Sequence, residues 1–108
     1  YRLMSASTER ARVIAGNIAN ENTPGYTRQV LQFEELLGDA LAQGRRDLAA
    51  IEPRIEVDRV TPARPDGNNV ELELELNASR QNRLLYETYA SILTTHFELL
   101  RAGIESGR

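Results

Sequence analysis

Few side chains of this sequence could take part in acid–base or metal chemistry. His96 is the only histidine in the chain, and histidine is the side chain that normally titrates near neutral pH. It follows Ile92 by four residues, and no carboxylate is spaced to join it in a recognisable metal motif. The pattern favours a packing or surface role for His96, with a ligand or general base as the alternative.

Three glutamates, Glu71, Glu73 and Glu75, alternate with leucines in the last third of the chain. On a helix their side chains fan around the axis, and on a strand they share a face but lack the mixed carbonyl and carboxylate ligands of a calcium loop. A solvated face near a helix N-terminus is therefore favoured over a cation site.

Other catalytic motifs are missing from the sequence. There is no cysteine, which excludes disulfides, thiolate ligands and cysteine nucleophiles. The serines lack the context of a nucleophile elbow, and there is no glycine-rich phosphate loop. We therefore expect no enzyme activity, no catalytic residue, no cofactor and no metal site.

Length and charge limit the architecture and the partners. The 108 residues predict a single domain, and the content of hydrophobic residues, 41%, is that of an ordinary globular chain. With 13 basic against 16 acidic residues, the net charge of -3 gives no reason to expect a nucleic-acid partner. No apolar run has the length of a membrane span, and no segment has the pattern of a cleavable signal.

The first 20 residues have the apolar spacing of a helix. Met4, Ser7, Ala11, Ile14 and Ile18 succeed one another at intervals of three and four residues, which predicts a helix over residues 3–20. Its seam is built mostly of small residues, which suits the close approach of a neighbouring helix.

A turn is expected directly after this helix, within residues 21–32. Proline presets the second position of Thr23-Pro24-Gly25-Tyr26, and glycine supplies the positive φ of a type II turn. We interpret the segment as a turn, anchored by Tyr26, that fixes the angle between an assembling helix and the next part of the chain; a simple helix stop is the alternative. The residues of this helix-end turn are Asn17, Asn20, Thr23, Pro24, Gly25 and Tyr26.

The middle of the chain predicts a short helix and an irregular insert. Phe33, Leu36, Leu37 and Leu41 lie on one stripe, which indicates a helix over residues 33–43. Residues 45–68 show no sustained period and contain three prolines, so we expect an irregular insert or a β-hairpin that ends in a turn at residues 66–69.

The remainder predicts a long helix over residues 69–106. Residues 70–76 alternate as in a strand, but leucine and glutamate are good helix formers, and Asn68 or Asn69 could cap a helix. From Tyr86 onward the apolar residues form a heptad seam. The expected fold is mainly α, with the N- and C-terminal helices packed as an antiparallel coiled-coil or bundle pair, a short middle helix and the insert.

One chain has too few apolar side chains to cover this seam, because the N-terminal helix offers mainly small residues. Burial of the seam contributes about 8 to 15 kcal/mol, less than the backbone entropy of ordering such a helix. We therefore expect partner chains. The predicted assembly interface consists of Ile14, Ile18, Tyr86, Leu93, Phe97, Leu100 and Ile104.

The segment N-I-A-N-E-N-T-P-G-Y at residues 17–26 resembles the signature of the bacterial flagellar axial proteins, the rod, hook and hook-associated family. Glu21 departs from it, since the family more often has a small residue there. The string D-G-N-N-V at residues 66–70, Tyr86 and the closing F-E-L-L-R-A-G-I look like the short proximal rod proteins of the basal body. The resemblance covers roughly residues 5–41 and 66–105.

The resemblance implies a structural subunit that polymerises through its terminal helices in a helical tube. Such a subunit is exported by the flagellar type III system without a cleaved signal and assembles in the periplasmic rod of the basal body. It links the export gate and MS ring to the rest of the rod, for torque transmission and protein export. The implied partners are copies of itself, other rod proteins such as FlgC, the adapter FliE, the export gate and the MS ring, and no small-molecule substrate.

Three other identities remain open at this point, and the weakest of them is an enzyme of unknown type. The neighbouring rod protein FlgC is the alternative within the family. A soluble helical adaptor or export chaperone, which would form a small closed bundle with a partner peptide, is the alternative from another class.

Overall fold

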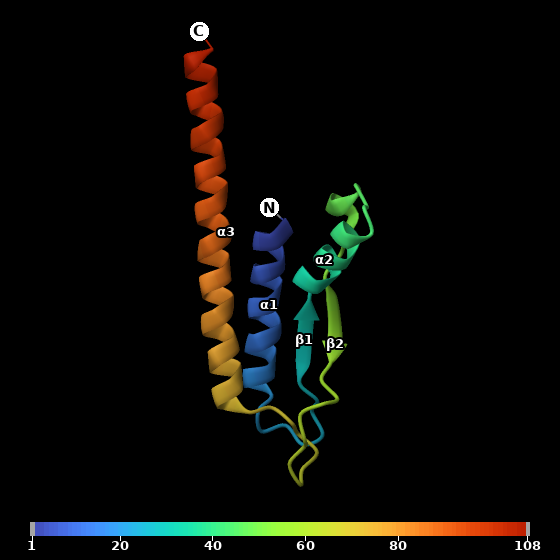
Figure 1. The fold of residues 1–108 in the computed structure, drawn as a ribbon. Helices are drawn as coiled ribbons and strands as arrows, with labels where there is room; N and C mark the ends of the chain where they lie inside the picture. The colour runs from blue at the N-terminus through green and yellow to red at the C-terminus, as the bar shows by residue number, and fades with distance from the viewer. Residues whose placement is uncertain (1, 108) are drawn as a thin grey trace.

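The computed structural model describes residues 2–107, so Tyr1 and Arg108 of the expected domain lie outside the described residues. Two terminal helices run side by side in opposite directions, and a small sheet with a short helix forms an arm on the other side of the N-terminal helix (Figure 1). The molecule is elongated, with extents of 68 × 28 × 15 Å. The elements are α1 (Arg2–Ala19), β1 (Gln29–Gln32), α2 (Glu34–Ala42), the 3-10 turn η1 (Leu48–Ala50), β2 (Arg54–Val57) and α3 (Leu72–Ser106).

The expected fold class, mainly α with an antiparallel pair of terminal helices, is confirmed. The long helix begins at Leu72 rather than at residue 69, and neither asparagine caps it, because the residue before the helix is an extended Glu71. Asn68 and Asn69 are buried, and their side chains bind loop carbonyl groups instead. The alternating residues 72–76 are helical, which settles the ambiguity between strand and helix for these residues.

The sheet differs from what the sequence predicts. The expected turn over residues 21–32 contains strand β1, and β2 pairs with β1 rather than within a hairpin of the insert. The pairing is antiparallel, with Leu31 opposite Ile55 and Gln29 opposite Val57. The physical reason is long-range burial, because Leu31 packs against α1 and is 4% exposed. The contact of Leu31 with the core therefore decides where the strand forms, and the local turn residues do not.

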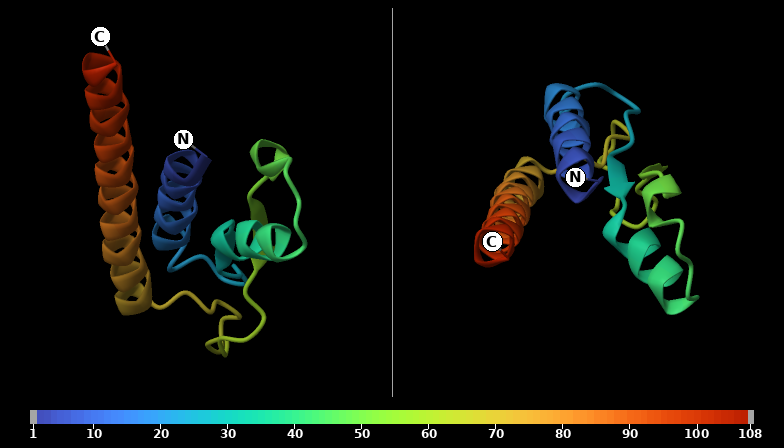
Figure 2. Two further views of the ribbon diagram at one scale, coloured as in Figure 1. Left: turned by 45° about the horizontal axis from the view of Figure 1, so that its top comes forward. Right: turned by 90° about the horizontal axis from the view of Figure 1, so that it is seen from above.

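The apolar core is small and lies between α1 and the arm. Its centre is Phe33, which is 1% exposed, and the cluster consists of Ala6, Leu31, Phe33, Ala40 and Ile51. Viewed from above, α1 stands between α3 and the arm (Figure 2). The apolar core therefore fixes the arm to α1, and other interactions must fix α3.

A candidate assembly site

The side chain of Asn17, near the end of α1, is fully buried and bonds in four directions. Its Nδ2 donates to the carbonyl oxygen of Gln29 at 2.8 Å and to Oε2 of Glu75 at 3.2 Å. Its Oδ1 accepts from the backbone N–H of Gln29 and from the hydroxyl of Tyr26, both at 3.0 Å. One amide therefore joins α1, the turn after it, β1 and the first turn of α3.

Glu75 continues this network into the arm. It is 0% exposed, and its Oε1 accepts from Nε of Arg28. The same guanidinium donates to Asp58 through Nη1 at 3.0 Å. The backbone N–H of Arg28 donates to Oδ1 of Asn69, whose Nδ2 donates to the carbonyl of Asp58 at 2.9 Å. We call these groups the basal network: Asn17, Tyr26, Arg28, Gln29, Asp58, Asn69 and Glu75.

Charges and hydrogen bonds within the basal network shift two acidic groups. The Thr61 hydroxyl donates a hydrogen bond to Asp58, and backbone N–H groups and Arg28 donate further bonds. Burial by itself would raise the pKa of Asp58, but these hydrogen bonds outweigh it and hold the pKa well below its usual value. Burial, and then the negative charge of Glu75, raise the pKa of Tyr26. The basal network is therefore ionised at Asp58 and neutral at Tyr26 near neutral pH.

The helix-end turn is held by the turn at residues 66–69. Asn68 donates through Nδ2 to the carbonyl groups of Asn20 and Thr23, at 2.8 and 2.9 Å, and Gly25 donates to the carbonyl of Asp66 at 2.8 Å. Gly25 and Gly67 both have positive φ, and a Cβ at Gly67 would lie 3.3 Å from the Cα of Gly25. The two segments pack backbone against backbone, because neither glycine has a side chain.

Pro24 and Gly25 are exposed, and Tyr26 is partly buried. The structure thus brings five of the six predicted turn residues together in one region. Four of them make side-chain hydrogen bonds, namely Asn17, Asn20, Thr23 and Tyr26, and Gly25 is held by its backbone N–H. Their role in assembly remains a prediction.

A second polar cluster lies halfway along the helix pair. Asn82 of α3 donates to the carbonyl of Ser7 at 2.8 Å and accepts from Arg10 at 3.0 Å. Arg10 also pairs with Glu34 at the start of α2, and Glu34 accepts from the Tyr89 hydroxyl at 3.1 Å. Burial alone would raise the pKa of Glu34, but the hydrogen bonds and charge of Arg10 outweigh it and lower the pKa. This cluster connects α1, α2 and α3.

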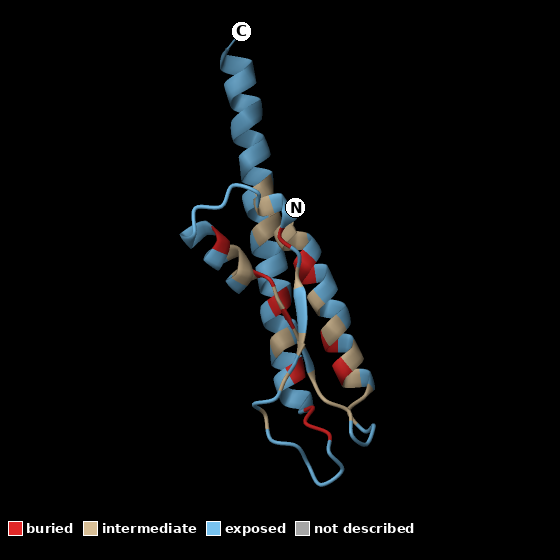
Figure 3. Cartoon of the chain, turned by 90° about the vertical axis from the view of Figure 1, so that its right-hand side faces the viewer, coloured by how far each residue is buried: buried red, intermediate tan, exposed pale blue. Residues whose placement is uncertain are grey.

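Glu75 and Asn82 lie on the same side of α3 as the predicted heptad seam, because 75, 82, 86, 93, 97, 100 and 104 are separated by three, four or seven residues. The part of this seam opposite α1 therefore includes buried polar residues. Beyond α1 it is apolar and exposed: Phe97, Leu100 and Ile104 are 50%, 51% and 66% exposed. Figure 3 shows that the whole outer part of α3 is exposed. We call Phe97, Leu100 and Ile104 the distal stripe.

The geometry of the two helices explains this exposure. At about 1.5 Å per residue, the 18 residues of α1 span about 27 Å and the 35 residues of α3 about 52 Å. Asn17 meets Glu75, and Leu3 and Met4 border a hollow with Tyr89 and Leu93. The described part of α1 therefore ends near the level of Leu93.

The other predicted interface residues have different surroundings. Ile14 is 6% exposed and is covered by the chain's own residues, so its role in an interchain contact stays a prediction. Ile18 and Leu93 are partly buried, and Tyr86 is 40% exposed. Of the predicted interface residues, only those of the distal stripe lie fully outside the contact with α1.

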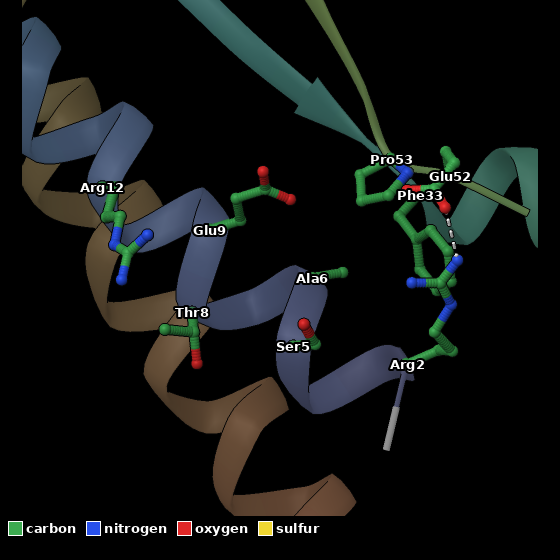
Figure 4. Close-up of a pocket in the computed structure, with 9 residues that line it drawn as sticks. All are labelled: Arg2, Ser5, Ala6, Thr8, Glu9, Arg12, Phe33, Glu52 and Pro53. Atoms are coloured by element: carbon green, nitrogen blue, oxygen red, sulfur yellow. Dashed lines mark hydrogen bonds and ion pairs between the residues drawn. The ribbon is translucent and has the colours of Figure 1, made fainter.

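The hollows of the structure contain no recognisable catalytic arrangement among the described residues. The one in Figure 4, of about 400 Å³, lies between α1 and the segment at Glu52–Pro53, where Arg2 bonds to Glu52 at 2.9 Å. His96 borders the apolar hollow near Leu3, and its ring lies 6.4 Å from that of Phe97. Within residues 2–107, no three metal-ligating side chains are grouped to hold an ion. None of the described helices combines the length and apolarity that crossing a bilayer requires.

Sequence reasoning missed Arg28, Asp58, Asn69, Glu75 and Asn82. It placed Glu75 on a solvated face, which is wrong, since this carboxylate is fully buried. The available signal was the heptad position that Glu75 and Asn82 share with the apolar seam. Nothing local marked Arg28 and Asp58, because their partners lie 30 to 47 residues away.

Comparison with known proteins finds relatives named flagellar basal body rod protein FlgB that align along nearly the whole chain. The chain is 26% identical to the flagellar basal body rod protein FlgB of Borrelia hermsii in an alignment 124 positions long, covering 97% of this chain and 92% of the relative. It is 25% identical to FlgB of Escherichia coli strain K12, covering 96% and 88%, and 28% identical to FlgB of Aeromonas hydrophila, covering 92% and 85%. No family model matches the chain. The resemblance to rod proteins, and to FlgB in particular, is thereby confirmed.

Proposed function

We propose that this chain is a structural subunit of the flagellar basal body rod, with the place in the rod that FlgB has, and that the distal stripe is its main contact with neighbouring subunits. The observation that carries the proposal is an exposed apolar stripe on a chain that aligns almost end to end with rod proteins. In this proposal the chain has no catalytic role.

The basal network and the cluster around Arg10 support the proposal. A helical polymer requires that every subunit present its surfaces at the same angles. Asn17 and Glu75 fix α3 against α1 at one end, and Asn82 with Arg10 fixes the pair halfway along. Buried polar groups of this kind favour one register of two helices, because any other leaves them unpaired. The distal stripe is thereby held in a defined direction relative to the arm.

The finer parts of the proposal come from the relatives' name and the family resemblance. The subunit is exported by the flagellar type III system to the periplasmic rod, where it polymerises with its own copies and with FlgC and FliE near the export gate and MS ring. There it links these parts to the rest of the rod for torque transmission and export. Their test is isolation of basal bodies from the source bacterium and detection of the chain, with these partners, in the rod fraction.

The distal stripe is tested by Leu100→Asp and Ile104→Asp in a strain that lacks the native gene. Both side chains are more than half exposed, so the folded chain should persist, as judged by helical circular dichroism. The matched control is Ala102→Asp, which adds the same charge on the opposite side of α3. We expect the two stripe variants to abolish motility and rod incorporation and the control to retain both. Normal motility with Leu100→Asp would contradict the proposal and favour a closed helical adaptor.

Leu93→Asp should also abolish incorporation. Leu93 borders the hollow next to Leu3 and Met4, so this variant also disturbs the end of the α1–α3 contact. It is therefore the less specific test.

A further inference from the structure

Strand β2 has an open outer edge. The sheet has two strands among the described residues, and β1 lies between α1 and β2, so that β2 borders solvent (Figure 1). The two apolar side chains of β2 are exposed as well, Ile55 by 50% and Val57 by 45%. An open strand with apolar side chains is a template for pairing with another strand.

The register shows which backbone groups of β2 are free. The N–H of Asp58 donates to the carbonyl of Arg28 at 2.8 Å, and these residues extend the ladder by one pair beyond Gln29 and Val57. Hydrogen-bonded and non-hydrogen-bonded pairs alternate along an antiparallel ladder. Hence Glu56 and Arg54 bond to β1, whereas the N–H and C=O groups of Ile55 and Val57 point outward.

Gln29, the partner of Val57, agrees with this assignment. Its N–H and C=O groups point away from β2, since both bond to the side chain of Asn17. These two hydrogen bonds occupy the edge of β1 that faces away from β2 at this position.

We propose that β2 pairs with β2 of a second copy of this chain, antiparallel and about a two-fold axis at Ile55. Ile55 then exchanges both backbone hydrogen bonds with Ile55 of the second copy. The N–H of each Val57 reaches the carbonyl of Pro53 in the other copy, and the missing N–H of Pro53 leaves no donor unpaired there.

Charge complementarity selects the second copy and this register. With Ile55 on the axis, Arg54 of each copy lies opposite Glu56 of the other, which gives two pairs of opposite charge. Within one chain these two side chains form a long ion pair of 3.7 Å, and they are 62% and 43% exposed. Such an exposed pair contributes little to stability, so both side chains can exchange it for the pairs across the axis. An axis at Glu56 would oppose two glutamates, and its only pairs of opposite charge would join Arg54 to Asp58, which Arg28 and Thr61 of its own chain already bind. An axis at Val57 would oppose Glu56 and Asp58, so both alternatives place like charges together.

This contact is separate from the rod contact proposed above. A two-fold contact closes after two copies and does not propagate a polymer. It uses the arm, whereas the distal stripe lies on α3 (Figure 2). We therefore assign it to pairs of free subunits, and its test is made in the Leu100→Asp background, where the distal stripe is disabled.

Cysteine cross-linking tests the register, because the natural chain has no cysteine. In the proposed pair the two Cα atoms of residue 55 lie about 5.5 Å apart, within disulfide reach. Those of residue 56 lie diagonally at about 7–8 Å, beyond it. We expect Ile55→Cys to form a disulfide dimer under mild oxidation several times faster than Glu56→Cys and than Leu41→Cys, an equally exposed control on α2. Equal rates, or faster dimer formation by Glu56→Cys, would overturn the proposal.

Charge exchange tests the pair without cysteine. Arg54→Glu alone places glutamates opposite each other twice, so self-association measured by analytical ultracentrifugation should weaken about tenfold. The double variant Arg54→Glu with Glu56→Arg restores both opposite pairs and should return the affinity to near its original value. A monomeric parent chain would refute the pairing, and so would a double variant that self-associates as weakly as the single variant. Either result is independent of whether the distal stripe contacts other subunits in the rod.

Discussion

The side-chain amide of Asn17 binds the backbone of Gln29 as a neighbouring strand would, donating to its carbonyl at 2.8 Å and accepting from its N–H at 3.0 Å. A helix residue thereby satisfies the edge of β1 and fixes the sheet to α1. The same amide reaches Glu75 at the start of α3. One side chain therefore links both terminal helices to the first strand of the arm.

Asn17→Ala should be strongly destabilising. It leaves the Gln29 backbone, the Tyr26 hydroxyl and one oxygen of Glu75 without a partner in a buried region, and we expect a loss of about 3 kcal/mol. Urea unfolding followed by circular dichroism measures it. Asn22→Ala, at an exposed position in the turn, is the control and should change the unfolding free energy by less than about 0.5 kcal/mol. Equal effects of both substitutions would show that the amide of Asn17 contributes little.

Tyr26→Phe should remove one hydrogen bond to Asn17 and cost about 1 kcal/mol. Tyr86→Phe is the matched control, since its ring is 40% exposed, and we expect almost no change there. Burial and the charge of Glu75 raise the pKa of Tyr26, so this contribution is complete below about pH 10 and is lost as the pH rises through the folded pKa. Unfolding measured at pH 8 and at pH 11 should show a smaller difference between Tyr26→Phe and the parent chain at pH 11. A difference that grows with pH would contradict this.

Acid should weaken the basal network through Asp58. Because the folded pKa lies below the ordinary value of 3.8, this carboxylate stabilises the fold above about pH 5, and its contribution is lost as the pH falls toward the folded value. Asp58→Asn should therefore be less stable than the parent at pH 7 and lose less stability between pH 5 and pH 2. The exposed Asp39, substituted by asparagine, serves as the control and should keep the parent's pH dependence. An unchanged acid profile for Asp58→Asn would refute the role of this carboxylate.

Three glycine substitutions should separate backbone strain from close contact. Gly67→Ala combines a φ of +85° with a Cβ only 3.3 Å from Gly25 Cα, and should be the most destabilising, by about 2 kcal/mol. Gly25→Ala has a φ of +77° in open space and should cost about 1 kcal/mol. Gly38→Ala, within α2 and also in open space, should instead stabilise by up to about 1 kcal/mol. Thermal unfolding gives the order directly, and a harmless Gly67→Ala would show that the two turns are not packed as described.

The helices were predictable because their signals are local. Steps of three and four residues in Met4, Ser7, Ala11, Ile14 and Ile18, and the heptads after Tyr86, repeat within a few turns, and a helix makes all its backbone hydrogen bonds within such a segment. The motif at residues 17–26 and the resemblance that it carries were readable for the same reason. Residues 72–76 showed the limit of this reasoning, because the alternation of leucine and glutamate fits a strand as well as a helix.

The interactions that hold these helices together were decided only in three dimensions. Strands β1 and β2 pair although α2 lies between them in the sequence. Glu75 can be buried because Arg28 and Asn17, 47 and 58 residues away, donate hydrogen bonds to it. A charge is buried only where its partners converge, and no local pattern states which distant residues those are. The sequence alone therefore predicted the helices and an apolar stripe too large for one chain to cover, whereas the tertiary structure determined which part of the stripe stays exposed and in which direction it faces.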